Sequence, residues 1–411
     1  MREGVARGET FSDRARKNLS ILDTIRRSGP ISKTEISSLI GVNVVTVSNY
    51  VEELLRQKMI FEKELDVSRG GRRPVLLDLN SDAGYAVGIG INLMHTIAVL
   101  VDMRGNLISC IKSDRPLRKA SDVVETILKL AKDILAQSGS YRDRIKGIGV
   151  GIAGIIDHKR ETVRWPEKNG SDCSYTLITL PLRETMEREC SLPVKVDNDA
   201  TVACFAEQWL AQESAIENLL YMFSSAGCGI MVNGEIYRGA SGCAGEMSIC
   251  IADKNEYFCV DKNQLCCLER SDLDLGIVAG AKQALSSQKH SKVYELCMGS
   301  EEKLNLEVIS RAVQAEDVFA LQLIKNAAKK LGIKAAFLVN VFNPQMVIIG
   351  GGLEKLGMPF IDEIRRIIAE MSFAEAAGSV KIVPSRIGEN AVALGAANLV
   401  VRDLYANTIK D

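Results

Sequence analysis

The spacing of apolar residues divides the chain into a helical N-terminal part and a longer part in which strands alternate with helices. Over residues 13–57, apolar side chains recur every three or four positions, which is the helical period. From about residue 83 onward, short apolar runs alternate with amphipathic stretches, which predicts an α/β body. We expect strands at 86–91, 96–101, 107–112, 145–152, 194–197, 218–223, 229–232 and 346–349, and helices at 121–137, 200–211, 306–342 with a break, 358–371 and 391–404.

Three helices are expected in the N-terminal part, and residues at their ends define them. The first helix ends at Ser28-Gly29-Pro30. Ser32 and Glu35 have the spacing of a capping box, in which the Ser32 hydroxyl accepts from the Glu35 amide and the Glu35 side chain reaches back. Gly41 then ends the second helix, and Asn43 caps the third. The second and third helices, joined across a turn that contains glycine, form a helix-turn-helix pattern.

Two apolar-rich strands at 59–65 and 75–79 follow these helices, and the sequence VSRGGRRP between them predicts the tip of a hairpin, or wing. Asparagine can bond adenine through two hydrogen bonds, valine and threonine methyl groups can meet the methyl of thymine, and arginines on a glycine turn suit a narrow minor groove. The alternative is a three-helix packing module with an ordinary polar face, and the arginine-rich tip weighs against it. The candidate DNA contacts are Val45, Thr46, Ser48, Asn49, Arg69, Arg72 and Arg73.

Composition and charge limit the classes of protein to consider. A chain of 411 residues is too long for one ordinary core, so two or three domains are expected. The net charge of −1 excludes DNA binding by bulk charge, but the first 80 residues hold 14 basic and 11 acidic side chains, a mildly basic head. No membrane helix or secretory signal is predicted. The odd number of cysteines, eleven, favours reduced thiols in a cytoplasmic protein.

Polar residues at the end of one predicted strand are candidates for ligand binding. The segment VKVDNDA places Asn198 and Asp199 at the carboxyl end of a strand in an α/β sheet, where ligands bind. Asp199 could take a proton from a sugar hydroxyl as a general base, or it could simply cap the helix that follows. Glu246 follows a glycine-rich turn, RGASGCAGEM, and three glycines at 350–352 follow the apolar strand MVII. Such turns let backbone amides approach a ligand or a neighbouring helix.

The segment GVGIAG at 149–154 matches the dinucleotide-binding fingerprint letter for letter. That fingerprint requires a helix to begin within it, whereas the residues that follow here predict the end of a strand and a turn. We therefore interpret these glycines as allowing close backbone approach to a ligand or a neighbouring strand.

Five cysteines fall between residues 243 and 267, two of them adjacent. Thiolates suit tetrahedral zinc, and the alternative is that these cysteines are small buried apolar residues. The candidate zinc ligands are Cys250, Cys259, Cys266 and Cys267.

Together these segments resemble the ROK family, which is named for its repressors, uncharacterised reading frames and sugar kinases. The resemblance is carried by SRGGRRP, GIGVGIAGIID, VDNDA, NGEIYRGASGCAGE, NPQMVIIGGGL and ALGAANL, in this order. It implies a two-lobed, actin-like ATPase fold with a sugar site in its cleft. We expect a winged helix-turn-helix domain at 13–80 and a sugar-sensing ROK domain at 83–411, with a first lobe at about 83–200 plus 385–411 and a second lobe at about 201–384.

The resemblance assigns roles only where the residues match. Asn198 and Asp199 match the pair that bonds the sugar hydroxyls, and Glu246 and Glu269 match glutamates that contact the sugar. The family's kinases carry Asp-x-Gly-Gly-Thr in the first hairpin, but this chain has Gly-Ile-Asn-Leu-Met at 90–94, without the phosphate-binding groups. The family's zinc-site histidine falls on Ile249, which leaves zinc open. Sugar specificity is expected in loops such as 157–180.

We therefore expect a transcriptional regulator, most simply a repressor of carbohydrate genes, that binds operator DNA as a homodimer or homotetramer and is released by a monosaccharide or sugar derivative. Neither ATP nor a membrane is expected as a partner. The first alternative is an ATP-dependent sugar kinase with an attached DNA-binding head, in which Asp199 would be the base. The second is a ligand-independent DNA-binding protein with a vestigial body.

Overall fold

The computed structural model describes residues 11–63, 75–115, 119–160, 162–168, 175–211, 216–224, 227–247 and 275–409. The helices are α1 (Asp13–Ser28), α2 (Lys33–Ile40), α3 (Val44–Arg56), α4 (Ala120–Gln137), α5 (Leu182–Cys190), α6 (Asp199–Trp209), α7 (Ile277–Ala284), α8 (Lys292–Leu296), α9 (Leu306–Gln314), α10 (Val318–Phe342), α11 (Met358–Met371), α12 (Ala374–Ser379) and α13 (Ala391–Asn407). The strands are β1 (Ile60–Lys63), β2 (Leu76–Leu79), β3 (Tyr85–Ile91), β4 (His95–Asp102), β5 (Leu107–Asp114), β6 (Ile145–Ile152), β7 (Ile155–Asp157), β8 (Thr162–Lys168), β9 (Tyr175–Leu180), β10 (Val194–Asn198), β11 (Leu219–Met222), β12 (Cys228–Val232), β13 (Glu235–Ile236), β14 (Met346–Ile349) and β15 (Lys381–Pro384). None of the helices within these ranges combines the length and apolarity that crossing a bilayer requires.

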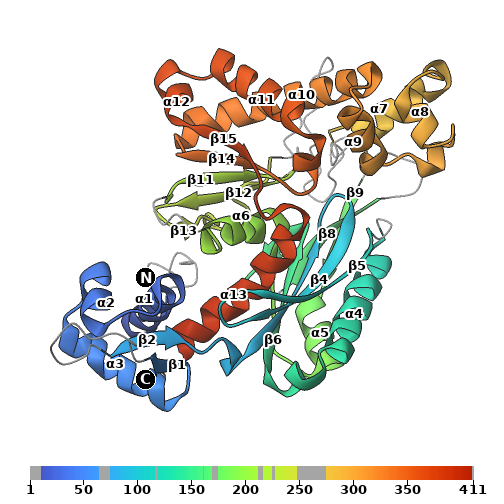
Figure 1. Ribbon diagram of the computed structural model, residues 1–411. Coiled ribbons are helices and arrows are strands. Elements are labelled where there is room, and N and C mark those ends of the chain that lie inside the picture. The colour runs from blue at the N-terminus through green and yellow to red at the C-terminus, as the bar shows by residue number, and fades with distance from the viewer. Residues whose placement is uncertain are drawn as a thin grey trace, which may run out of the picture.

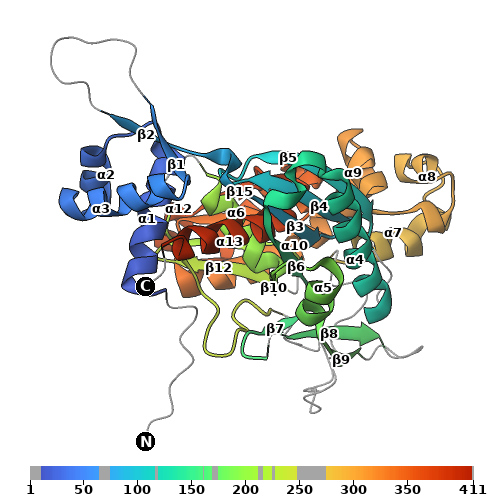
Figure 2. The same ribbon diagram turned by 90° about the horizontal axis from the view of Figure 1, so that it is seen from below.

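The N-terminal head consists of α1, α2 and α3 followed by the antiparallel pair β1 and β2. The capping box of Ser32 and Glu35 is present, Gly41 ends α2 in the left-handed region at φ 66°, and the Asn43 side chain accepts from the amide of Val45. These features confirm the helix boundaries expected from the sequence. The head lies at one end of the molecule, and α7, α8 and α9 lie at the other (Figures 1 and 2).

The first lobe is built on a five-stranded sheet in the order β10-β6-β3-β4-β5, in which β3, β6 and β10 are parallel. Helix α13 packs on one face of this sheet, and α4 packs on the other (Figure 1). Glycines of β3 and β6 allow α13 to lie very close, because a Cβ atom at Gly149 would come within 1.9 Å of the Ala396 carbonyl oxygen. The chain continues from β6 into β7 without a helix, which confirms that GVGIAG is no dinucleotide fingerprint.

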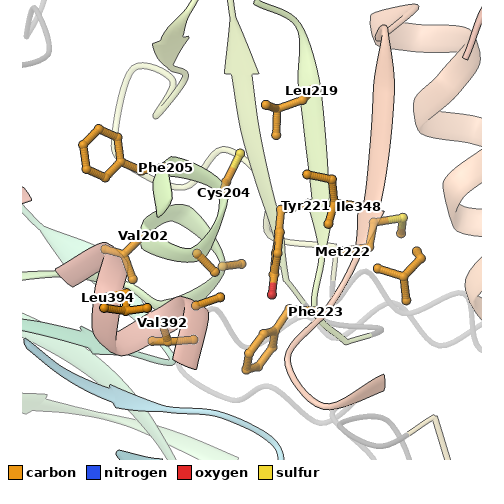
Figure 3. Packing of buried hydrophobic residues seen from close by; sticks show 14 of the residues in the cluster. Val202, Cys204, Phe205, Leu219, Tyr221, Met222, Phe223, Ile348, Val392 and Leu394 are labelled. Carbon is orange, nitrogen blue, oxygen red and sulfur yellow. The ribbon is translucent and has the colours of Figure 1, made fainter. Parts of the chain in front are cut away.

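The second lobe holds a five-stranded sheet in the order β13-β12-β11-β14-β15. Helices α10, α11 and α12 lie on one side of it, and α6 packs against β11 and β12 on the other side (Figure 1). Helix α6 also packs along α13, so it lies between the two lobes. In Figure 3, Val202 of α6 lies beside Leu394 of α13, and Cys204 points toward the strand that carries Leu219 and Tyr221. The exact bounds expected for the head, 13–80, and for the two lobes stay a prediction.

The strands and helices expected from the sequence are present, and the break expected within 306–342 falls between α9 and α10, where Asp317 caps α10. The elements that the sequence did not predict are α5, α7, α8, α12, β13, β15 and the small sheet of β7, β8 and β9. Residues 157–180, expected as loops, form much of that sheet. The sequence did not predict a strand there because β8 mixes charged residues with Trp165 and Pro166. A proline within a run of residues argues against a central strand.

Candidate functional site

The junction between β10 and α6 presents two of the predicted sugar-site residues. Asn198 is the N-cap of α6: its side-chain oxygen accepts from the amide of Thr201 at 3.2 Å, and its side-chain nitrogen donates to the Gly154 carbonyl at 3.2 Å. Asp199 is the first residue of the helix, is 6% exposed, and accepts from the amide of Ala200 at 2.8 Å. The alternative in which Asp199 is only the helix cap is therefore wrong, because Asn198 performs that role.

Glu246 comes to the same place from the second lobe. Its backbone pairs with Gly227 in an isolated β-bridge, next to a hydrogen bond from the Cys228 amide to the Gly245 carbonyl. Burial raises the pKa of Asp199 to about 6, although Arg115 opposes this shift. Burial raises the pKa of Glu246 to about 7, and the negative charge of Asp199 adds to that shift. Two partly or fully desolvated carboxyl groups thus lie between the lobes, where their oxygens can accept hydrogen bonds from hydroxyl groups. Glu269 lies outside the described residues.

A network of charged residues that the sequence did not predict lies next to the junction between β10 and α6. The buried carboxylate of Asp197 pairs with Arg238 at 2.5 Å and lies 3.8 Å from Nε2 of His158. The three residues come from β10, from the segment after β13 and from the turn after β7. The sequence indicated that the glycine-rich segment RGASGCAGEM belongs to the site. It did not indicate that the arginine of this segment, Arg238, pairs with Asp197. The network holds the segment that leads to Glu246 against the strand that leads to Asn198.

The first hairpin packs against the second lobe where a kinase of this fold is expected to hold phosphates. The buried side chain of Asn92 accepts from the amides of Met94 and His95 at 2.7 Å, which closes the turn. The Leu93 amide donates to the Gly351 carbonyl at 3.2 Å. A Cβ atom at Gly352 would lie 3.3 Å from the Met94 sulfur, so the three-glycine turn approaches apolar side chains. Phosphate oxygens would find no hydrogen-bond donor in the side chains of Leu93 and Met94.

An ion cluster also joins the lobes beside this hairpin. Glu389 pairs with Lys112 of β5 and, at 3.0 Å, with Lys355 of the second lobe. The His95 Nδ1 atom lies 3.5 Å from the same carboxylate. Burial alone would raise the pKa of Glu389, but hydrogen bonds and charge from the two lysines lower it to about 2. The carboxylate therefore stays ionised at neutral pH and ties the lobes together.

The third helix of the head exposes the face expected to read DNA. Val45 is 67% exposed, Asn49 is exposed, and Thr46 and Ser48 are half-buried. The opposite face is part of the head's core, and it comprises Val47, Val51 and Leu54. The candidate face is therefore separate from the packing face. Arg69, Arg72 and Arg73 of the wing lie outside the described residues.

Replacing Asn49 with alanine is expected to weaken discrimination at one base position per half-site by about 1–3 kcal/mol. The reason is that an exposed amide at this position can form two hydrogen bonds with adenine. The measurement is anisotropy titration of the full chain against a set of operator variants with single base changes. Asn326→Ala, at an exposed asparagine on α10, is the matched control. Equal loss of affinity on all DNA sequences would contradict base reading by Asn49.

The expected zinc ligands Cys250, Cys259, Cys266 and Cys267 all lie outside the described residues. Within the described ranges, no group of three or more histidine, cysteine, aspartate or glutamate side chains is arranged to hold a metal ion. Cys243, the first cysteine of the cluster, is half-buried. Zinc binding by the other four cysteines stays a prediction.

Comparisons with known proteins agree with the fold. The ROK family pattern matches residues 85–403. A xylose repressor of Caldicellulosiruptor bescii is 30% identical over 394 residues, covering 94% of this chain and 96% of that protein. The crystal structure of a ROK family transcriptional regulator, a homologue of the E. coli MLC protein, has a TM-score of 0.74 at 22% identity and covers 96% of this chain and 97% of its own. A ROK family glucokinase from Streptomyces griseus, in complex with glucose and AMPPNP, has a TM-score of 0.63 at 24% identity and covers 77% of this chain and 99% of its own. The match over 85–403 includes both lobes, so this chain belongs to the ROK family.

Proposed function

We propose that this protein is a sugar-responsive transcriptional repressor whose head binds operator DNA and whose body binds the sugar. The observation that carries the proposal is the presence, in one chain, of an exposed polar face on α3, separate from its packing face, and of Asn198, Asp199 and Glu246 between the lobes. The similarity to a xylose repressor over 94% of this chain supports the same function.

The site favours a neutral sugar over a phosphorylated one. Asp199 is buried and Glu246 is half-buried, and desolvation raises the pKa of both carboxyl groups, so added negative charge is disfavoured here. Sugar hydroxyls would donate to these oxygens and replace the lost water, whereas a phosphate placed beside them would add repulsion. We propose a free monosaccharide as the effector, with Asn198, Asp199, Glu246 and Glu269 as its contacts. Xylose is the first candidate because the relative is a xylose repressor.

The head is expected to bind DNA as part of a homodimer or homotetramer. One recognition helix reads few bases, and two heads related by symmetry can read two half-sites one helical turn apart. Val45, Thr46, Ser48 and Asn49 would contact bases, and Arg69, Arg72 and Arg73 would contact the minor groove or phosphates.

We infer that the body does not catalyse phosphoryl transfer. Phosphoryl transfer depends on positioning the nucleotide and on stabilising its charge. Here the first hairpin packs Leu93 and Met94 against the glycine turn at 350–352, where a phosphate group would need hydrogen-bond donors. Because the fold is similar to that of a ROK family glucokinase, sugar kinase activity is the second candidate function. A structural zinc ion held by Cys250, Cys259, Cys266 and Cys267 is a further proposal, and ATP is not expected to bind.

The test is an anisotropy titration of the full-length protein on DNA from upstream of its own gene, repeated with xylose, other neutral pentoses and hexoses, and their phosphates. We expect one neutral sugar to reduce operator affinity by about 5–150-fold, the usual range of allosteric coupling, and its phosphate to act less. If no sugar changes operator affinity, the protein is a ligand-independent DNA-binding protein. If the protein phosphorylates one of the sugars with ATP, and Asp199→Asn abolishes that activity, it is a kinase.

A further inference from the structure

Helix α6 connects the candidate sugar site directly to the DNA-binding head. Its N-terminal end carries Asn198 and Asp199, and its C-terminal end carries Trp209, which contacts α1. Eleven helical residues span about 16 Å at 1.5 Å per residue. Figure 1 shows α6 alongside α13, on the side that faces the second sheet. One short element therefore touches both functional regions.

The packing of α6 leaves it little freedom to bend. Ten of its eleven residues are buried. Glycines let its neighbours touch its backbone on two sides, because a Cβ atom at Gly395 of α13 would lie 1.9 Å from the Val202 carbonyl oxygen, and one at Gly229 of β12 would lie 2.2 Å from that of Ala200. A helix clamped this closely moves as a rigid body with its neighbours, since packed interiors transmit displacement.

A buried arginine of the head closes the far end of α6. The guanidinium of Arg26, a residue 8% exposed, donates to the Trp209 carbonyl at 2.8 Å and stacks 4.3 Å from the centre of the indole ring. The positive charge thus lies at the negative end of the helix dipole as well as over an aromatic face. Asp23 lies on α1, as Arg26 does, and accepts two hydrogen bonds from the guanidinium, at 2.7 and 2.9 Å, which hold it in place. A movement of Trp209 is therefore passed to α1 through the side chain of Arg26.

The contact continues from α1 to the wing. Arg104, in the turn between β4 and β5, donates to the Arg26 carbonyl at 2.8 Å and to Asp78 of β2 at 2.6 Å. The side chain of Arg104 thus hydrogen-bonds the first lobe to both α1 and β2 of the head. A shift at these hydrogen bonds changes the orientation of the whole head relative to the body.

We propose that α6 transmits the sugar signal, and that the contact between Arg26 and Trp209 is the coupling element that converts a shift of Asp199 into a reorientation of the head. The inference rests on the proposed function, since it assumes that a sugar binds at Asn198 and Asp199. A sugar that draws Asp199 and Glu246 together moves the N-terminus of α6 with the lobes. Trp209 then displaces Arg26, so the two head orientations differ in free energy with and without sugar.

The test uses Arg26→Met, which keeps an unbranched apolar stem but removes the charge and the donors, and Trp209→Phe. Within the described residues the indole N–H has no hydrogen-bond partner, so phenylalanine at this position removes none. Arg144→Ala is the matched control: it removes an arginine that stacks on Tyr85 at 5.0 Å, in the first lobe and away from α6.

Two quantities are measured on the full-length proteins: sugar affinity without DNA, by calorimetry, and the ratio of operator affinities without and with the sugar that acts on the wild type. We expect Arg26→Met to reduce that ratio at least 5-fold, Trp209→Phe to reduce it less, Arg144→Ala to leave it unchanged, and all sugar affinities to stay within 2-fold. An unchanged ratio in Arg26→Met and Trp209→Phe would overturn the inference while leaving the proposed function intact. A ratio of one in the wild type would overturn both.

Discussion

Replacing Asp199 with asparagine is expected to abolish the response to sugar and, at the same time, to stabilise the sugar-free protein at neutral pH. A carboxylate is a strong acceptor for a hydroxyl, and an amide of the same shape offers a weaker oxygen and a competing donor. The amide oxygen can still accept from the Ala200 amide, so the local fold is kept. Removing a desolvated charge then raises the free energy of unfolding.

The gain in stability has a defined dependence on pH. Burial raises the pKa of Asp199 from its ordinary value of 3.8 to about 6 in the folded protein. The folded state therefore binds the proton more tightly than the unfolded state, so the contribution of Asp199 to stability is full below about pH 4 and is lost as pH rises through 6. A shift of this size corresponds to a loss on the order of 3 kcal/mol at pH 7. The raised pKa of Glu246 acts in the same direction.

Denaturant unfolding of the wild type and of Asp199→Asn at pH 5 and pH 7.5 measures this effect, and operator titration with sugar measures the response. The variant is expected to gain more stability at pH 7.5 than at pH 5. Asp143→Asn, at an exposed aspartate, is the control and should change neither property. A full sugar response in Asp199→Asn would remove Asp199 from the proposed sugar contacts. A loss of stability at pH 7.5 would contradict its desolvation.

Replacing Gly395 with alanine is expected to destabilise the body by about 3 kcal/mol or more, a large effect for one methyl group. A Cβ atom there would lie 1.9 Å from the Val202 carbonyl oxygen and 2.5 Å from the carbonyl carbon, which is backbone and cannot move aside as a flexible side chain would. Helices α13 and α6 would have to separate, and the core between the two lobes would open.

The measurement is denaturant or thermal unfolding, and Gly378→Ala is the matched control. Gly378 lies in α12, and a Cβ atom there would meet nothing within 4 Å. The control is therefore expected to gain up to about 1 kcal/mol, because alanine favours helix over glycine. If Gly395→Ala were as stable as the control, the close contact between α13 and α6 would be refuted.

The sequence was sufficient for features whose cause lies within a few residues. The capping box of Ser32 and Glu35, the left-handed Gly41 and the cap at Asn43 set the boundaries of the head's helices through local hydrogen bonds, so spacing alone revealed them. The same holds for the buried strands of both sheets, whose apolar runs are short and bounded by turns. Asn198 and Asp199 were recognised as site candidates because the end of a strand in an α/β sheet is a known position for ligands.

Only the tertiary structure decided which of these segments meet. Arg26 and Trp209 are 183 positions apart, and Asp197 and Arg238 are 41 apart, so no local pattern could pair them. Asp199 and Glu246 acquire their raised pKa values from burial between two lobes, a property of the assembled core and not of either segment. The sequence by itself determined the longer, strongly periodic elements and the chemical groups they carry, because those depend on local hydrogen bonds and periodicity. The tertiary structure decided the contacts between site and head, because they depend on the packing of α6 between α13 and the second sheet.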